Sequence, residues 1–195
     1  MAYFFTSDLH FGSRITLKRE NRPFKNVDDF NEYVVKVWNS QANKTDFIYV
    51  LGDFFSYSYV DRISYKSAIN LVKKINAKII LILGNNEGRI IKEEFDGNFD
   101  KFRKFLINQG FFDVKYDMFL EINNRHFYLN HYPRNHKDGY INLFGHIHKA
   151  TGLYKPFGFN MSCDLNYFRL YNVEDIEDLI IAKEKHWLND PDVNS

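Results

Sequence analysis

A chain of 195 residues with a hydrophobic fraction of 45% is long enough to bury a substantial core in one domain. Its 26 basic and 25 acidic residues nearly cancel, which argues against a protein that coats a polyanion through many phosphate contacts. No stretch approaches the roughly 20 apolar residues of a membrane-spanning helix, and the N-terminus does not resemble a signal peptide. We therefore expect a cytoplasmic protein with no membrane segment and no extended nucleic-acid surface.

Cys163 is the only cysteine, so no disulfide can form within the chain, which fits a reducing compartment. The segment 159–163 looks like a strand, and we expect a buried packing role for the thiol. The sequence contains no repeats, low-complexity tracts or linker-like stretches. It therefore predicts a single domain over residues 1–188 and a short, frayed tail over 189–195.

The first half of the chain alternates between apolar runs and helical patterns. The runs at 3–6, 47–51 and 79–83 predict buried strands, and residues 11–26 predict a loop because they show little periodicity. A helix is predicted to start at Asp28 or Asp29, and another after Asp61. Their apolar faces comprise Phe30, Val34, Val37 and Trp38 in the first, and Ile69, Val72 and Ile75 in the second. This alternation predicts parallel strands joined by crossover helices.

The second half reads mostly as strands. A helix over 98–109 with an aromatic stripe precedes it and is stopped by Gly110. Asn123-Asn124 between two apolar runs predicts a β-hairpin, and a final helix is predicted near 173–184. The outline is two sheets packed together with helices outside.

Five apolar runs are each followed within a step or two by a residue that can bind a metal ion. These residues are Asp8, His10, Asp53, Asn85, His131, His146 and His148. Buried strands of open α/β sheets place their ligands at their carboxyl ends, so the residues should converge on one crevice. If the strand continues through Asp8 and His10, both side chains point to the same side. Seven oxygen and nitrogen donors exceed what one divalent ion needs, which indicates two metals.

Carboxylate, imidazole and amide donors without a thiolate suit Mn²⁺, Zn²⁺, Fe or Ni²⁺, and we take Mn²⁺ as the first choice. Two ions about 3.5–4 Å apart can hold a bridging hydroxide and clamp both oxygens of an in-line phosphoryl displacement. Their four positive charges exceed the two negative charges of Asp8 and Asp53. The surplus favours an anionic substrate such as a phosphate ester.

The ordered set of motifs resembles the calcineurin-like metallophosphoesterase superfamily over residues 6–148. The motifs are Asp8-Leu9-His10, Gly52-Asp53, Gly84-Asn85-Asn86-Glu87, His131 and Gly145-His146-Ile147-His148. The segments 5–12, 21–24 and 129–133 are further similar to a small, single-domain subgroup from bacteria and phages.

The resemblance implies an α/β fold, a four-layer αββα sandwich of two mixed sheets flanked by helices, with two divalent metals at the strand ends. Carried over by position, one ion would take Asp8, His10 and His148. The other would take Asn85, His131 and His146, and Asp53 would bridge the two. His126, His136 and His186 lie outside the motifs and are interpreted as ordinary surface or core residues.

One position departs from the family pattern. The third motif of the family has a histidine where this chain has Asn86, which can donate a hydrogen bond but cannot deliver a proton near neutral pH. The loss should slow the hydrolysis of monoesters with an alkoxide leaving group most, and that of diesters less. Small family members that lack this histidine tend to favour diesters. We therefore take Asn86 and Asp53 as candidate catalytic residues and expect a phosphodiesterase.

Residues that contact the substrate are harder to choose from the sequence. Arg134 is the first choice for a phosphate partner because it follows His131, and Arg14, Arg22 and Arg89 are further candidates. Glu87 could orient a ligand imidazole. Four aromatic residues after Asp53 could stack a base or pack in the core; they are Phe54, Phe55, Tyr57 and Tyr59.

The leading hypothesis is a dinuclear metal-dependent phosphodiesterase acting on a nucleotide, a cyclic nucleotide or a nucleic-acid end. A phosphomonoesterase, including a protein phosphatase, is the first alternative, and Asn86 counts against it. The second alternative is a non-catalytic scaffold that keeps the fold. A scaffold would be expected to have lost metal-binding residues, yet all seven carried-over positions hold residues that can bind a metal ion. A different metallohydrolase fold fits poorly because HExxH and cysteine-rich signatures are missing.

Overall fold

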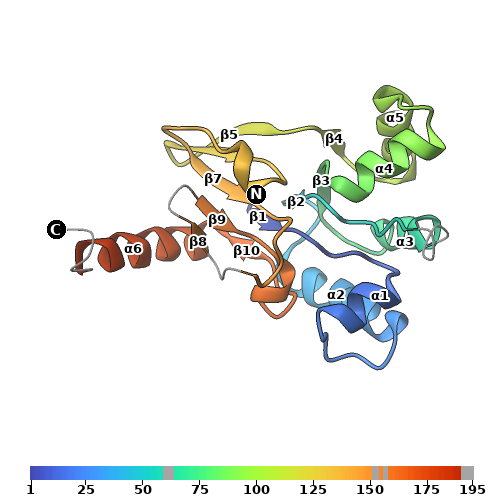
Figure 1. Ribbon diagram of the computed structural model, residues 1–195, viewed down its shortest axis with the longest axis horizontal. Helices are drawn as coiled ribbons and strands as arrows, with labels where there is room; N and C mark the ends of the chain where they lie inside the picture. The colour runs from blue at the N-terminus through green and yellow to red at the C-terminus, as the bar shows by residue number, and fades with distance from the viewer. Residues whose placement is uncertain (59–63, 151–153, 156–157, 190–195) are drawn as a thin grey trace.

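The computed structural model describes residues 1–58, 64–150, 154–155 and 158–189, and contains two five-stranded sheets that share a hydrophobic cluster (Figure 1). The strand orders are β10-β1-β2-β3-β4 and β5-β6-β7-β9-β8. The first sheet comprises β1 (Tyr3–Thr6), β2 (Phe47–Leu51), β3 (Lys78–Ile82), β4 (Asp113–Lys115) and β10 (Tyr171–Asn172). The second comprises β5 (Met118–Ile122), β6 (Arg125–Leu129), β7 (Ile141–Phe144), β8 (Tyr154–Lys155) and β9 (Gly158–Asn160).

The helices lie around these sheets. They are α1 (Arg14–Arg19), α2 (Val27–Gln41), α3 (Ser64–Val72), α4 (Asn85–Glu94), α5 (Phe99–Gln109) and α6 (Val173–Asn189). Strands β1 to β4 pair in parallel and β10 joins β1 antiparallel, which confirms the predicted crossover connections. In the second sheet β6, β7 and β9 are parallel, with antiparallel partners at both edges. The fold is therefore α/β with two mixed sheets flanked by helices, as the sequence resemblance implied.

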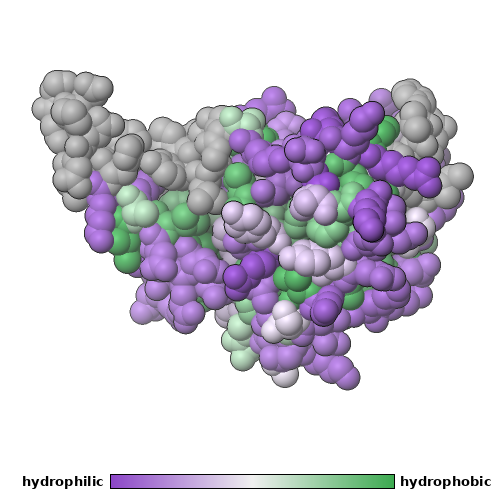
Figure 2. Space-filling model, turned by 90° about the horizontal axis from the view of Figure 1, so that it is seen from below, coloured by the Kyte–Doolittle hydropathy of each residue, from purple (hydrophilic) through white to green (hydrophobic). Residues whose placement is uncertain are grey.

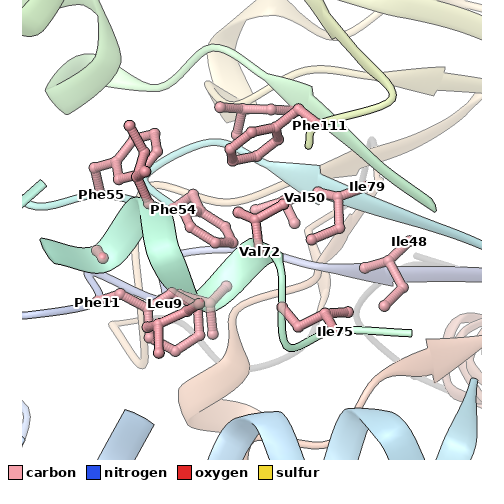
Figure 3. Packing of buried hydrophobic residues seen from close by; sticks show 14 of the residues in the cluster. Leu9, Phe11, Ile48, Val50, Phe54, Phe55, Val72, Ile75, Ile79 and Phe111 are labelled. Carbon is pink, nitrogen blue, oxygen red and sulfur yellow. The ribbon is translucent and has the colours of Figure 1, made fainter. Parts of the chain in front are cut away.

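The first sheet is buried on both faces, which explains its nearly uninterrupted apolar strands. On one face, Ile48 and Val50 of β2 and Ile79 of β3 pack with Val72 of α3 (Figure 3). On the other face, Tyr49 of β2 joins the cluster shared with the second sheet. Successive residues of one strand thus enter different clusters, as the period of two in a β-strand requires. This packing holds the carboxyl ends of the strands in fixed positions.

Helix α2 begins two residues earlier than predicted. Its N-cap is Asn26, whose side chain accepts a hydrogen bond from the backbone N–H of Asp29 at 2.8 Å. Asp28 and Asp29 instead lie in the first turn, where they complement the helix dipole. The predicted apolar face is confirmed, because Phe30, Val34 and Trp38 are buried and Val37 packs against them.

The prediction of a loop over residues 11–26 was wrong in part, because Arg14–Arg19 form the short helix α1. Ser13 caps this helix, its hydroxyl accepting from the backbone N–H of Thr16 at 3.0 Å. A helix of this length carries too few apolar positions to show a period in the sequence. The helix brings Arg19 to the cavity described below.

Two further helical predictions agree with the structure. Helix α5 ends where Gly110 adopts a left-handed conformation with φ 115°, as expected of a helix stop. In α3, Ile69 and Val72 are buried, and Ile75 is buried beyond the helix end. Asp61, the predicted start of this helix, lies outside the described residues.

The hairpin in the second half is confirmed. Asn123 and Asn124 join β5 to β6 with φ of 52° and 60°, the left-handed conformations of a type I′ turn. Helix α6 is longer than predicted and places Ile176 in the cluster shared by the two sheets. Tyr59 and residues 190–195 of the predicted tail lie outside the described residues.

One face of the molecule carries mostly polar side chains among the residues that the structure describes (Figure 2). On the face shown in Figure 2, hydrophilic residues cover most of the area, and hydrophobic ones are visible between them. Within the described part of the chain, no helix is long and apolar enough to cross a membrane.

Cys163 is completely buried, which confirms the predicted packing role. It does not lie in a strand, however. Strand β9 ends at Asn160, and Cys163 begins the short 3₁₀ turn η2 (Cys163–Leu165). Its thiol lies 3.4 Å from the carbonyl oxygen of Asp8. The turn therefore sits directly behind the first candidate ligand.

Candidate metal centre

The predicted ligands come together at the carboxyl ends of five strands. Asp8 and His10 follow β1, Asp53 follows β2, and Asn85 follows β3. The second sheet supplies the rest, and these are His131 after β6 and His146 and His148 after β7. Both sheets therefore contribute to one site, as the sequence predicted.

The first half of the site contains Asp8, His10 and His148. One potential ligand atom from each of the three lies within 4.8 Å of the other two. The Nε2 atoms of His10 and His148 are 3.2 Å apart. His10 Nε2 also lies 3.5 Å from Oδ2 of Asp53. This is the set that the sequence resemblance assigned to one ion.

The second half contains Asn85, His131 and His146. Asn85 Oδ1 lies 3.1 Å from His131 Nε2 and 3.0 Å from His146 Nδ1. His131 Nε2 lies 3.9 Å from Oδ1 of Asp53, whose other carboxylate oxygen is the one near His10. Asp53 is thus placed between the two halves, as a bridging ligand would be.

Two outer hydrogen bonds indicate that ring lone pairs face the centre. His131 Nδ1 lies 2.8 Å from the carbonyl oxygen of Leu51, which can only accept, so Nδ1 carries the proton and Nε2 has the lone pair. His148 Nδ1 lies 2.9 Å from a carboxylate oxygen of Asp164, which likewise places a proton on Nδ1 and leaves the lone pair of the neutral ring on Nε2. The His131 lone pair therefore faces Asn85 Oδ1, another acceptor. Two atoms that each direct a lone pair at the other are suited to binding a cation between them. These side chains therefore fit metal ions as ligands.

Burial of the acids supports the same conclusion. Burial and the nearby charge of Asp8 raise the pKa of Asp53 to about 7. Burial and the charge of Asp53 likewise raise the pKa of Glu87 to about 7. Burial lowers the pKa of His10 well below its usual value, so no imidazolium there balances the acids. A divalent cation at these acids would stabilise their charged forms.

Five of the seven ligand candidates have a left-handed backbone. The φ angles are 60° for Asp8, 49° for His10, 53° for Asp53, 75° for His146 and 46° for His148. The strand β1 ends at Thr6, so the assumption that it continues through Asp8 and His10 was wrong. Non-glycine residues in this region are strained, and they persist where the surroundings hold them. Here the N–H of His10 donates to the carbonyl of Asp53 at 2.9 Å, and that of Asp8 to Gly52 at 3.1 Å.

Glycines allow the loops to approach closely. A Cβ on Gly145 would lie 2.5 Å from Ser7 Oγ and 2.8 Å from Asp8 Oδ2. A Cβ on Gly52 would overlap His131 Nδ1 and lie 2.6 Å from Cγ of the same ring, and Gly52 also has φ of 87°. These overlaps explain why small residues precede the ligands in the second and fifth motifs.

Glu87 does not orient an imidazole, contrary to the suggestion from the sequence. Its carboxylate accepts hydrogen bonds from backbone N–H groups of Asp53 and Gly84, both at 2.9 Å, and of Phe55 at 3.1 Å. It therefore connects the loop after β2 to the start of α4.

Asn86 is buried beside the candidate bridging ligand. Its Nδ2 donates to Asp53 Oδ2 at 2.6 Å, and its Oδ1 accepts from the backbone N–H of Tyr57 at 2.8 Å. It also lines a cavity of about 270 Å³ above the site, together with His10, His146 and His148. Its catalytic role stays a prediction.

The arginine candidates lie in three different environments, which are the cavity, the surface elsewhere and the protein interior. Arg89 of α4 lines the cavity, and so does Arg19 of α1, which sequence reasoning missed. Arg14 lines other surface pockets, and Arg134 is exposed beside the Tyr132 ring, 5.3 Å from its centroid. Arg22 is buried and pairs with Asp164, so it is not available to a substrate.

Of the aromatic residues after Asp53, the two phenylalanines serve in packing. Phe54 and Phe55 are fully buried and contact each other edge to face (Figure 3). Tyr57 is also buried, and its hydroxyl donates to Glu94 at 2.9 Å. Base stacking by the two phenylalanines is therefore excluded by their burial.

Comparisons with known proteins show what the chain is similar to. The chain is 35% identical over 81 residues to the uncharacterized protein MJ1445 of Methanocaldococcus jannaschii, covering 42% of this chain and 44% of that protein. It is 32% identical over 84 residues to the Gene 66 protein of Mycobacterium phage L5, covering 43% of this chain and 39% of that protein. The matched region thus spans less than half the length of these curated relatives.

A protein of unknown function from Aquifex aeolicus, AQ665, has a similar fold, with a TM-score of 0.61 at 18% identity over 91% of this chain and 98% of that one. The model of the calcineurin-like phosphoesterase family matches residues 1–194. That match includes every candidate ligand described above. The chain therefore belongs to the calcineurin-like phosphoesterase family.

Proposed function

We propose that the protein is a dinuclear metal-dependent phosphodiesterase that hydrolyses a nucleotide, a cyclic nucleotide or a phosphate ester at a nucleic-acid end. One ion would be held by Asp8, His10 and His148, and the other by Asn85, His131 and His146. Asp53 would contribute to both. The preferred metal is Mn²⁺, and the proposed compartment is the cytoplasm, where the free thiol of Cys163 stays reduced.

The observation that carries the proposal is the inward direction of the lone pairs. The backbone carbonyl of Leu51 and the carboxylate of Asp164 fix the outer ring nitrogens of His131 and His148 as donors. The inner nitrogen of His131 then faces Asn85 Oδ1, another acceptor, which is typical of a metal site, and that of His148 faces His10 Nε2. A scaffold would not need to maintain this arrangement.

The bound ions supply Lewis-acid activation of water and stabilise charge on the phosphoryl group. The protein residues orient the ester. Arg19 and Arg89 line the cavity and bring two guanidinium groups to an anionic substrate. Gly84 and Asn86 hold the start of α4 against Asp53. The N–H groups of this helix end also favour negative charge.

The preference for diesters rests on Asn86. Its amide groups are engaged by Asp53 and Tyr57, and an amide does not release a proton to a leaving group. An ester with a poor leaving group therefore lacks an acid at this position. Diesters with stable leaving groups depend less on such an acid.

The test compares hydrolysis of bis-p-nitrophenyl phosphate and p-nitrophenyl phosphate by metal-stripped protein resupplied with Mn²⁺. We expect metal-dependent turnover of the diester, weak turnover of the monoester, and loss of both in Asp53→Asn. Asp96→Asn serves as the matched control, because the Asp96 side chain is 92% exposed outside the site. Preference for the monoester would favour a phosphomonoesterase, and failure to bind metal would favour a scaffold.

A further inference from the structure

A buried ion pair lies directly behind the first half of the metal centre. Arg22 donates from Nε to Asp164 Oδ1 at 2.8 Å and from Nη2 to Asp164 Oδ2 at 3.0 Å. Both side chains are 1% exposed. Such a two-pronged pair fixes the carboxylate in position and direction. Asp164 belongs to the turn η2 and follows all the family motifs in the sequence.

The remaining N–H groups of Arg22 bind the loop that carries the first ligands. Nη1 donates to the carbonyl of Leu9 at 2.6 Å, and Nη2 to the carbonyl of Asp8 at 2.7 Å. The guanidinium group also lies over the rings of Phe30 and Phe168, 4.8 and 5.5 Å from their centroids. Arg22 thus connects Asp164 rigidly to the backbone between the two ligands of the first motif.

The other side of Asp164 faces His148. Oδ2 lies 2.9 Å from His148 Nδ1. Arg22 offers only donors, so both carboxylate oxygens act as acceptors and the proton of the imidazole is placed on Nδ1. In the neutral imidazole Nε2 then keeps its lone pair, and it faces His10 Nε2 at 3.2 Å. A carboxylate that receives the outer N–H of a metal-binding histidine fixes both its tautomer and its ring direction.

The same atoms could in principle form a separate cation site, because Glu20, His148 and Asp164 offer ligand atoms within 4.8 Å of one another. The contacts argue against it. Arg22 places a permanent positive charge against both oxygens of Asp164, and Glu20 already accepts from Arg19 Nε at 2.7 Å. The arrangement is therefore that of a positioning group.

We propose that Asp164, held by Arg22, is a positioning residue that fixes His148 with its proton on Nδ1 and its Nε2 directed at the first metal. This inference rests on the proposed function, since it assigns a role toward the metals. It gives a role to Asp164, which no motif contains, and a new role to Arg22, which the sequence suggested only as a phosphate partner. It also explains why Arg22 is buried although other arginines of the same segment are exposed.

The test uses Asp164→Asn, which keeps the shape of the side chain. Arg22 needs an acceptor, so the amide oxygen should face Arg22 and the amide NH₂ group should face His148. His148 Nδ1 must then accept, which moves the proton to Nε2 and blocks the ligand atom. Asp113→Asn is the control. Asp113 lies on β4, away from the metal centre, and also pairs with basic side chains, those of Arg103 and Lys115.

Isothermal titration of metal-stripped protein with Mn²⁺ gives the first readout. We expect two ions per chain in the wild type and in Asp113→Asn, and a loss of about 10–100-fold in affinity at one of the two sites in Asp164→Asn. Unchanged binding in a folded Asp164→Asn protein would overturn the inference and leave the proposed function intact. Binding of a third ion that Asp164→Asn removes would also overturn it. A wild type that binds no metal would overturn the proposed function itself.

The second readout needs no variant and is independent of activity. Nitrogen-15 NMR of the histidine rings in wild-type protein loaded with Zn²⁺ should show His148 protonated on Nδ1. Protonation on Nε2 would contradict the inference, even if Asp164→Asn fails to fold.

Discussion

Asn86 donates from its side-chain Nδ2 to Asp53 Oδ2 at 2.6 Å, and its backbone N–H donates to Asp53 Oδ1 at 2.9 Å. One residue therefore satisfies both oxygens of the carboxylate placed between the two halves of the site. The third motif of the family usually has a histidine at this position. The substitution has kept a donor toward Asp53 and lost a group that can transfer a proton.

Asn86→His should restore an acid at this position. General acid catalysis contributes about 10²–10⁴-fold, so we expect hydrolysis of glycerol 2-phosphate to rise by about 10² relative to bis-p-nitrophenyl phosphate. The measurement is the ratio of kcat/KM for the two esters with Mn²⁺. Asn86→Ala should lower both activities without changing their ratio. An unchanged ratio in Asn86→His would show that this position does not set the preference.

Gly84→Ala should damage the centre without any change in a ligand. Its Cβ would overlap Asp53 Oδ1 and lie 2.9 Å from Glu87 Oε2. We expect a cost of about 1–3 kcal/mol in the free energy of unfolding and weaker Mn²⁺ binding. Gly88→Ala, in the same helix, is the control, because a Cβ there meets nothing within 4 Å. It should stabilise the protein by about 0.5–1 kcal/mol with normal metal binding, measured by urea unfolding and calorimetry.

Arg89→Ala should weaken substrate binding. Loss of a charge-assisted hydrogen bond costs about 1.5–3 kcal/mol, which corresponds to a rise in KM of about 10–100-fold for the diester. Arg14→Ala should leave KM unchanged, because Arg14 does not line the cavity above the site. The same assay tests the prediction for Arg134, whose side chain is exposed beside Tyr132. If Arg134→Ala raises KM and Arg89→Ala does not, the substrate approaches from the other side of His131.

Cys163 should react with Ellman's reagent only when the protein unfolds. The thiol is fully buried, and burial raises its pKa well above the usual value, so it stays protonated in the folded protein. The labelling rate should therefore follow the unfolding rate in urea. Fast labelling of native protein would mean that the turn behind Asp8 opens.

The same thiol should make stability depend on alkaline pH. Above about pH 8.5 the thiol of the unfolded chain loses its proton while the folded thiol keeps it, so the unfolded state becomes favoured. The contribution is fully present below that pH and is lost as pH rises, with a slope of up to about 1.4 kcal/mol per pH unit. Cys163→Ala should flatten this slope between about pH 8.5 and 10. Equal slopes in both proteins would contradict the expectation.

Much of the fold, and the convergence of the ligand candidates, could be predicted because both follow from local patterns. The apolar runs of β2 and β3 are buried on both faces, so they stand out from their surroundings. The ligand candidates follow directly at the ends of such runs. Helix α2 was predictable from its apolar face, although its cap at Asn26 was not, since Asp28 is an equally good capping residue.

The remaining features depend on partners that lie far apart in the sequence. Asp164 meets Arg22 across a separation of 142 residues, and nothing near either residue indicates that both are buried. The carboxylate of Glu87 is used by backbone N–H groups, which carry no sequence signal. Arg19 reaches the cavity only because α1 is helical, and α1 is too short to show a period.

The most direct measurement is anomalous diffraction from a crystal grown with Mn²⁺. The account predicts two anomalous peaks, one among Asp8, His10 and His148 and one among Asn85, His131 and His146, with Asp53 in contact with both. No peak at these residues, or a single peak at Glu20 and Asp164, would contradict it.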